Sequence, residues 1–189
     1  YISSRITAPG VITETGGFQR IVFGPFNRPI DKQATALQAA FISSGIKAEL
    51  KQEMIEELWR KFIFITSMGS MTALTRLTHG ELLLSPETMA VVFDAMKEAG
   101  AVARAKGIAL PPISPEKIIE GLKRFDPATR SSMYYDLVGG KPLELEALNG
   151  TIVRLGTSLR VPTPIHRTIY AGLLPYHVRH SDRTEPQRA

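Results

Sequence analysis

The sequence predicts a mainly α-helical protein whose first 50 residues form a short α/β segment. From Lys51 onward, apolar residues recur at helical spacing, and prolines and glycines separate the helices that this spacing predicts. Before Lys51, short runs rich in β-branched residues alternate with Gly and Pro turns around one helical stretch. The 189 residues are enough for one or two domains with a sizeable core.

The segment before Lys51 is too small for a complete α/β domain, but it fits the end of one. Asp31 can cap a helix that runs to Ser44, with Leu37 and Phe41 facing inward and a glycine stop behind them. The predicted strands are Tyr1–Thr7, Val11–Thr15, Arg20–Phe23 and Ile46–Leu50.

The run from Ile55 to Glu81 opens the helical part of the chain. Ile55, Leu58, Trp59 and Phe62 follow the spacing of one apolar helix face. Lys61 lies about 200° round the helix from Trp59 and is flanked by apolar residues. A lysine in such surroundings can be a tunable ammonium, or a packed helix-edge lysine whose head reaches water.

Helix start and stop signals divide the rest of the chain. Ser-Pro-Glu at 85–87 and again at 114–116 combines a cap, a first-turn proline and an acid. The Met89, Phe93 and Met96 stripe reads as core. The predicted helices are 86–107, 115–124, one from Asp126-Pro127 to Gly139, 143–159, and one from Pro162-Pro164 to Leu174. The resulting domain prediction is an α/β segment over 1–50, an all-helical domain over 51–176 and a polar tail over 177–189.

Composition narrows the possible partners. The net charge of +5 is spread thinly, unlike the clustered basic stripe of a nucleic-acid binder, so no nucleic-acid partner is expected. Attraction for an anionic small molecule fits the charge equally well. The chain has no cysteine, which suits a cytoplasmic protein, and no apolar run long enough to span a bilayer, so no membrane partner is expected. The histidines offer no convincing zinc site, so no metal is expected.

Three residues remain as candidates for chemistry. The chain lacks the glycine-rich phosphate-binding patterns and the nucleophile-elbow pattern. Lys61, Ser132 and Glu144 are polar residues that could act together. Each also has a plain structural explanation: a helix-edge lysine, a helix-surface serine, and an acid that favours the positive end of its helix.

Several motifs together resemble the C-terminal half of the ketopantoate reductases (2-dehydropantoate 2-reductases). The resemblance covers residues 1 to about 176. The spacing between the second serine of S-S-M and the glutamate of P-L-E makes it fairly specific. The motifs are P-G-V-I at 9–12, R-I-V-F-G at 20–24, E-L-W-R-K at 57–61, T-A-L-T-R at 72–76, H-G-E at 79–81, S-S-M-Y-Y-D at 131–136, P-L-E-L-E-A-L-N-G at 142–150 and V-P-T-P at 161–164.

This resemblance implies a two-domain, NADPH-dependent oxidoreductase of the 6-phosphogluconate-dehydrogenase-like type. An N-terminal Rossmann domain would hold the cofactor, and an all-helical C-terminal domain would supply most of the substrate site and a homodimer contact. The substrate would be ketopantoate, in pantothenate biosynthesis, or a related 2-oxo acid. By position, Lys61 falls on the family's catalytic lysine and Ser132 on the serine that binds the substrate carboxylate. Glu144 falls on the glutamate beside the lysine and substrate, where we expect catalytic and cofactor contacts.

The sequence departs from the family pattern where asparagines contact the substrate. Ile65 and Gly69 stand four and eight residues after the lysine, in place of two asparagines, and His79 replaces a third. If these three positions still line the substrate, they predict a different or less polar 2-oxo acid. Arg76 could compensate as an anion ligand or simply lie at the surface.

Two further expectations follow from the resemblance. The chain opens without methionine and without a glycine-rich loop, so we expect it to begin inside a longer protein and to bind NADPH only weakly alone. The alternative function is a non-catalytic helical module for dimerisation or interaction. The missing asparagines favour that alternative, and retention of the lysine, serine and glutamate together argues against it.

Overall fold

The computed structural model describes residues 4–14 and 19–182. The chain separates into two compact units, Tyr1–Leu58 and Trp59–Ala189. The protein is mainly helical, as the sequence predicts. None of the helices in the described part combines the length and apolar composition of a membrane span.

The first unit contains two pairs of strands and one helix. β1 (Ser4–Ala8) and β2 (Val11–Glu14) form an antiparallel hairpin, whose turn uses Gly10 at a positive φ of 76°. β3 (Ile21–Phe23) pairs in parallel with β4 (Ala48–Leu50), and α1 (Lys32–Ser43) connects them. The predicted strands and helix are therefore present, although residues 1–3 and 15 of two strands lie outside the described residues.

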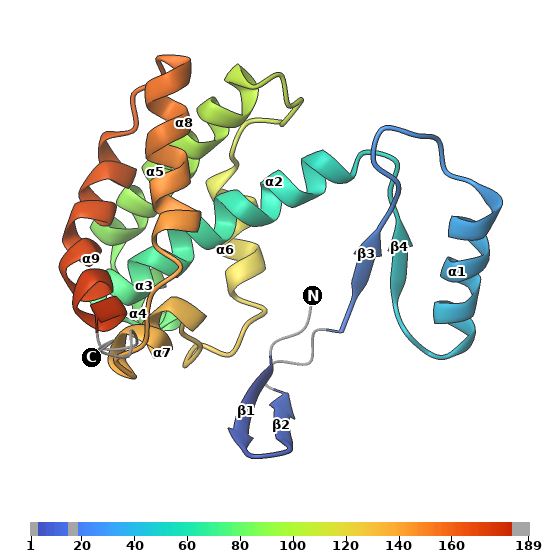
Figure 1. Cartoon of the computed structure of the whole chain (residues 1–189), viewed down its shortest axis with the longest axis horizontal. Coiled ribbons are helices and arrows are strands. Elements are labelled where there is room, and N and C mark those ends of the chain that lie inside the picture. Colours follow the sequence, from blue (N-terminus) through green and yellow to red (C-terminus); the bar gives the residue numbers. More distant parts are fainter. Residues whose placement is uncertain (1–3, 15–18, 183–189) are drawn as a thin grey trace, which may run out of the picture. The chain divides into compact units, whose positions relative to one another are not determined.

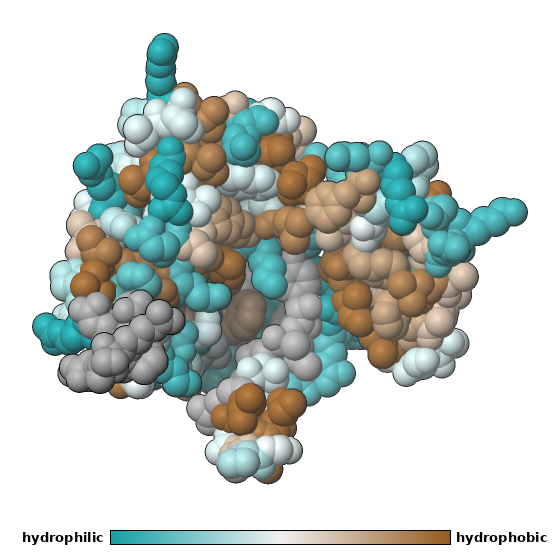
Figure 2. All heavy atoms as spheres, in the orientation of Figure 1, coloured by the Kyte–Doolittle hydropathy of each residue, from teal (hydrophilic) through white to brown (hydrophobic). Residues whose placement is uncertain are grey.

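Helix α1 begins where its cap was predicted, but it buries little. The Asp31 carboxylate accepts a 2.8 Å hydrogen bond from the Ala34 amide, and the Phe41 ring meets Phe23 edge-on. The prediction that Leu37 faces inward is wrong, because its side chain is 47% exposed. A two-stranded sheet covers only one strip of the helix. Figure 2 shows apolar atoms at the surface near this helix and on the β1–β2 hairpin.

The second unit is a bundle of helices (Figure 1). Two π-helical turns, η1 and η2, interrupt the helices of this unit. The helix α2 begins in the first unit and continues into the second. The elements are α2 (Met54–Phe64), η1 (Ile65–Gly69), α3 (Ser70–Thr75), α4 (His79–Leu83), α5 (Pro86–Ala105), α6 (Pro115–Leu122), α7 (Ser132–Val138), η2 (Glu146–Gly150), α8 (Thr151–Leu159) and α9 (Pro164–Asp182).

Helix α5 forms the centre of the core. It starts at the predicted Ser85-Pro86 pair, and Val92, Ala95 and Met96 on its inner face are fully buried. Its alanines let neighbouring helices approach closely, because interaxial distance depends on side-chain size. Accordingly, α5 packs against α8, α9 and η1 (Figure 1).

Three helix boundaries differ from the sequence prediction. The turn at 126–129 is not a helix start, because the Asp126 carboxylate instead bonds the Ala128 amide, and α7 begins only at Ser132. The predicted helix over 143–159 opens with the η2 turn. The last helix continues past Pro175 to Asp182, and the Arg76 guanidinium covers the Tyr176 ring in its added turns. Residues 183–189 of the predicted tail lie outside the described residues.

The inner face of α2 also differs from the prediction. Trp59 is buried as expected, but Ile55 and Leu58 are 40% and 44% exposed. Ile63 replaces them in the core, with an exposed fraction of 4%. Ile55 and Leu58 precede the boundary at Trp59 between the two compact units, so they are not part of the core of the helical unit.

Two helix glycines give a matched test of this packing. A methyl group on Gly156 of α8 would lie 2.7 Å from Thr163 Cγ2 and 2.8 Å from the Val161 carbonyl oxygen. A methyl group on Gly121 of α6 would meet no atom within 4 Å. We expect Gly156→Ala to lower the free energy of unfolding by about 1–3 kcal/mol through overpacking.

The control, Gly121→Ala, should raise the free energy of unfolding by about 0.5–1 kcal/mol, because alanine restricts the unfolded chain. Urea denaturation of both variants measures whether each substitution lowers or raises the free energy of unfolding. A neutral or stabilising Gly156→Ala would contradict the packing described for α8.

Candidate active site

The predicted catalytic lysine lies at the end of a regular helix, directly before a π turn. Lys61 belongs to the last turn of α2 and its side chain is exposed. Ile65 and Gly69 are the first and last residues of η1, and both are half-buried. Isolated π turns inside helices occur frequently at functional sites. Three predicted site residues thus lie on one short stretch of backbone.

Ser131, the neighbour of the predicted substrate-binding serine, joins α7 to that stretch. Its hydroxyl donates to the Gly69 carbonyl over 2.8 Å and accepts from the Tyr134 amide, which caps α7. The Thr72 hydroxyl of α3 donates to the Ser131 hydroxyl oxygen over 2.7 Å. Ser132 follows as the first residue of α7, with an exposed side chain. The start of α7 is therefore fixed against the end of η1.

The second π turn follows the predicted glutamate and is bonded to the first. Glu144 is exposed and lies two residues before η2. Asn149 of η2 is fully buried, and its amide donates over 3.1 Å to the Thr66 carbonyl of η1. Its side-chain oxygen accepts from the Ser70 hydroxyl over 2.5 Å. One side chain therefore ties together the two segments that follow Lys61 and Glu144.

His166 completes this buried network. Its Nε2 lies 3.0 Å from the Ala95 carbonyl of α5, which can only accept, so Nε2 carries the proton. Its Nδ1 then accepts the second amide proton of Asn149 over 3.1 Å. Burial lowers the pKa of His166 to about 4, so the imidazole is neutral at pH 7.

The Glu98 carboxylate caps the helix that carries His166. It accepts hydrogen bonds from the Ile165 and His166 amides at the start of α9, at 2.8 and 3.0 Å. Partial burial raises the pKa of Glu98, although these two hydrogen bonds act in the opposite direction. The cap and the His166–Asn149 bond together fix α9 against α5 and η2.

His79, the third position predicted to line the substrate, is buried at the start of α4. Its side chain is 6% exposed, and its ring meets the Phe125 ring edge-on at 5.8 Å between centroids. Its Nδ1 has no hydrogen-bond partner among the described residues. Burial lowers the pKa of His79, so this imidazole is also neutral at pH 7. His79 thus contributes an aromatic surface and one unsatisfied ring nitrogen.

Arg76 has a structural role in this region. It ends α3 with a left-handed φ of 67°, and its guanidinium donates to the Ala73 and Leu74 carbonyls at 2.6 and 2.8 Å. These bonds satisfy the last carbonyls of the helix.

Most of the predicted site positions therefore belong to three joined segments: η1, the start of α7 and the approach to η2. The meeting of the Lys61, Ser132 and Glu144 side chains in one cleft stays a prediction. The described residues hold no group of three side chains suited to a metal ion. Sequence reasoning missed Asn149 and His166, although Asn149 belongs to the N-G pair in the motif at 142–150.

The family comparison matches the helical part of the chain. A model of the ketopantoate reductase PanE/ApbA C-terminal domain matches residues 53–176. The chain belongs to this family. The match includes both π turns, the start of α7 and the buried Asn149–His166 network.

Similar proteins match beyond the helical unit. The 2-dehydropantoate 2-reductase of Caulobacter vibrioides is 28% identical over 174 residues, which cover 91% of this chain and 57% of that protein. A PanE/ApbA family ketopantoate reductase from Ralstonia eutropha is 30% identical, with a TM-score of 0.80 over 96% of this chain and 58% of that one. The fold also resembles a ketopantoate reductase from Staphylococcus aureus, described as dimeric, at 24% identity and a TM-score of 0.81 over 95% of this chain and 60% of that one. The chain thus spans little more than half the length of the relatives that it matches.

The buried amide gives the first prediction for this site. Asn149→Leu keeps a similar volume but leaves the Thr66 carbonyl, the Ser70 hydroxyl and His166 Nδ1 without their partner. Each buried unsatisfied group costs about 1–3 kcal/mol, so we expect a loss of roughly 3 kcal/mol or more of unfolding free energy.

Ser158→Ala is the matched control for Asn149→Leu. Its exposed hydroxyl bonds only a carbonyl of its own helix, and surface changes of this kind cost about 0.5 kcal/mol at most. Denaturant titration measures both variants. Equal unfolding free energies for Asn149→Leu and Ser158→Ala would show that the hydrogen bonds of Asn149 contribute little to stability.

The low pKa of His166 predicts that stability falls in mild acid. The unfolded chain binds a proton near the ordinary value of 6.5, whereas the folded protein does so only near 4. The unfolded state therefore holds more protons between these values, and stability is lost as pH falls. From about pH 7 to pH 5 the expected loss is roughly 2 kcal/mol.

The other buried groups modify this pH dependence in known directions. His79 adds to the loss, because its pKa is also lowered. Glu98 opposes it, because a carboxyl with a raised pKa favours the folded state as pH falls. Denaturation curves at both pH values should show a smaller loss for His166→Gln than for the unchanged protein. If both proteins lost the same stability between pH 7 and pH 5, His166 would not be the cause of the pH dependence.

Proposed function

We propose that this chain is the substrate domain of an NADPH-dependent reductase that converts a 2-oxo acid to a 2-hydroxy acid. Three observations support the proposal: family membership, the three candidate residues at matching positions, and the direct bond between η1 and η2. The main support is the hydrogen bond from the Asn149 amide of η2 to the Thr66 carbonyl of η1, because it joins the segment that follows Lys61 to the segment that follows Glu144.

The proposed chemistry assigns one task to each side chain. The cofactor supplies a hydride to the substrate's carbonyl carbon. The carbonyl oxygen gains negative charge, and the Lys61 ammonium stabilises it and then donates a proton. The neutral lysine regains its proton from solvent. Glu144 orients the ammonium, and the Ser132 hydroxyl donates to the substrate carboxylate.

The residues around these positions favour a less polar substrate than ketopantoate. Ile65 and Gly69 cannot donate side-chain hydrogen bonds to a substrate hydroxyl. The neutral ring of His79 rests on Phe125, whose ring stacks on Phe64. We propose that an apolar side chain on the 2-oxo acid packs near this region.

The first unit supports a role for a larger cofactor domain. Its parallel strands β3 and β4, joined by α1, are the building unit of dinucleotide-binding sheets. Leu37 and Ile42 of α1 are exposed, as expected for a helix that further strands would cover. We propose that NADPH binds mainly to such an N-terminal domain, with Glu144 as this chain's contact. We also propose a homodimer formed through the helical unit.

The decisive variant is Lys61→Ala in the full-length enzyme. Loss of the proton donor should lower kcat by roughly a hundred- to ten-thousand-fold, with the circular dichroism spectrum unchanged. Ser132→Ala should mainly raise KM for the 2-oxo acid, because it removes a substrate contact.

Lys97→Ala serves as the matched control for Lys61→Ala. This exposed lysine is paired with Asp94 on α5, and its loss should leave kcat unchanged. Rates with NADPH and a panel of 2-oxo acids identify the substrate. Persistent activity in Lys61→Ala would disprove its role. If no 2-oxo acid is reduced and the protein is dimeric, the non-catalytic module is the better explanation.

A further inference from the structure

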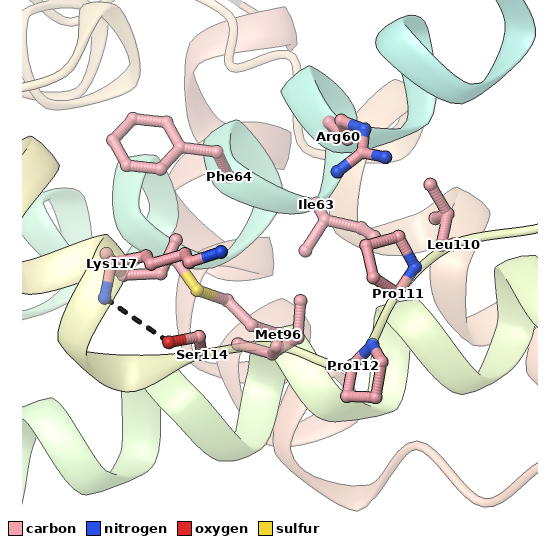
Figure 3. Close-up of a pocket in the computed structure, with 11 residues that line it drawn as sticks. Arg60, Ile63, Phe64, Met96, Leu110, Pro111, Pro112, Ser114 and Lys117 are labelled. Atoms are coloured by element: carbon pink, nitrogen blue, oxygen red, sulfur yellow. Dashed lines mark hydrogen bonds between the residues drawn. The ribbon is translucent and has the colours of Figure 1, made fainter. Parts of the chain in front are cut away.

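An open hollow of about 370 Å³ lies in the helical unit, where the end of α8 leads into the start of α9. It shares no lining residue with the apolar cavity shown in Figure 3, whose wall includes Phe64 and so borders the region proposed for the substrate side chain. Taking about 30 Å³ for each water-sized group, the hollow has room for roughly twelve non-hydrogen atoms. It therefore suits a small molecule.

Two arginines border this hollow. Arg160 and Arg167 both line it, and both are exposed. Within residues 4–14 and 19–182, neither guanidinium forms an ion pair or a hydrogen bond. No aspartate or glutamate is among the described residues that line the hollow. Guanidinium groups bind phosphate oxygens through paired hydrogen bonds, so this arrangement favours a phosphate group as the ligand.

A buried hydroxyl adds a third donor. Thr163 lines the hollow and is only 9% exposed, yet its hydroxyl has no hydrogen-bond partner in the part of the chain that the structure describes. Gly156 also lines the hollow, and a methyl group there would lie 3.0 Å from Thr163 Oγ1. The glycine therefore leaves space beside this oxygen. A phosphate oxygen in the hollow would satisfy the hydroxyl, which otherwise stays unpaired at a cost in free energy.

The backbone at the start of α9 does not supply these donors. The Ile165 and His166 amides already donate to the Glu98 carboxylate, and the Arg167 amide donates to the Thr163 carbonyl. The Glu98 carboxylate does not line the hollow. Recognition of a ligand therefore depends on side chains, namely two guanidinium groups and one hydroxyl.

The rest of the wall is apolar and rigid. Pro162 and Pro164 line the hollow on either side of Thr163, and their rings fix the backbone dihedral angles. Val153 and Val161 line it as well, and both are half-buried. A compact hydrocarbon group would find a surface that is already formed, which limits the entropic cost of binding.

We propose that this hollow is a binding site for a small phosphomonoester. Its phosphate pairs with Arg160 and Arg167 and accepts a hydrogen bond from the Thr163 hydroxyl. Its organic part lies against Val153 and Val161. A phosphomonoester carries about two negative charges at pH 7, which suits two guanidinium groups. The site does not depend on the proposed reductase activity, because it uses none of the three residues assigned to that reaction.

The test is an NMR titration of the ¹⁵N-labelled 189-residue chain with phenyl phosphate, phenol and inorganic phosphate. Phenyl phosphate should shift the amide signals over 153–167. Phenol lacks the charge and should bind at least about tenfold more weakly. Inorganic phosphate should shift the same signals only at higher concentration, because it lacks the organic part. Arg160→Gln and Arg167→Gln should each weaken phenyl phosphate binding by about tenfold.

A pair of variants tests the hydroxyl. Thr163→Val keeps the shape of the side chain but removes the donor, so phenyl phosphate binding should weaken by roughly three- to tenfold. Thr163→Ser keeps the hydroxyl and should retain most of the affinity. Circular dichroism verifies that each variant is folded. Equal affinities for the valine and serine variants would contradict the role of this hydroxyl.

Control variants separate the site from general attraction by charge. Arg104→Gln, in the last turn of α5 and outside the lining, removes the same charge and should leave binding unchanged, as should Lys61→Gln. The proposal fails if phenyl phosphate does not bind, if phenol or inorganic phosphate binds as tightly, or if Arg104→Gln weakens binding as much as Arg160→Gln. It also fails if only Lys61→Gln abolishes binding, which would place the ligand at the proposed active site.

Discussion

The helical unit depends on the hydrogen bonds of one buried side chain, the amide of Asn149. A π turn displaces the helical hydrogen-bond register, so a carbonyl in it must find a donor elsewhere. In η1 the Thr66 carbonyl receives that bond from Asn149, which itself sits in the other π turn. The same amide needs an acceptor for its second proton, and neutral His166 provides it. The Thr66 carbonyl of η1 is thus satisfied by a residue distant in sequence, whereas the Glu146 carbonyl of η2 accepts hydrogen bonds from the nearby Thr151 and Arg154.

This constraint explains which parts of the fold could be predicted from the sequence. Helix starts at Ser85 and Ser114 were found because cap and proline lie within one turn and act locally. The η1 turn was not predicted, because the side chain that bonds to it and to Ser70 belongs to a residue about 80 positions away. The inner face of α2 was misread because Ile55 and Leu58 precede the boundary at Trp59 where the helical unit begins, and periodicity alone does not reveal that boundary. The last helix was expected to end at about Leu174, but it continues past Pro175 to Asp182.

The candidate site shows the same division. The family motifs led to Lys61, Ser132 and Glu144 through their spacing in the sequence, and their roles in the site stay predictions. No periodicity or charge pattern indicates Asn149 or His166, whose importance comes from complete burial and complementary hydrogen bonding. Ser131 was expected only as a residue within a helix, yet its hydroxyl both starts α7 and bonds the Gly69 carbonyl. Residues that position a site are harder to predict than residues that act in it, because the former depend on tertiary contacts.

The two predicted substrate positions in η1 carry a small and an apolar residue. A Cβ on Gly69 would approach Ser131 Cβ at 3.5 Å, which is ordinary van der Waals contact, so alanine would fit at this position. Ile65 is half-buried and has no polar group to satisfy. Neither residue has a side-chain hydrogen-bonding group, which is in keeping with the less polar substrate proposed above.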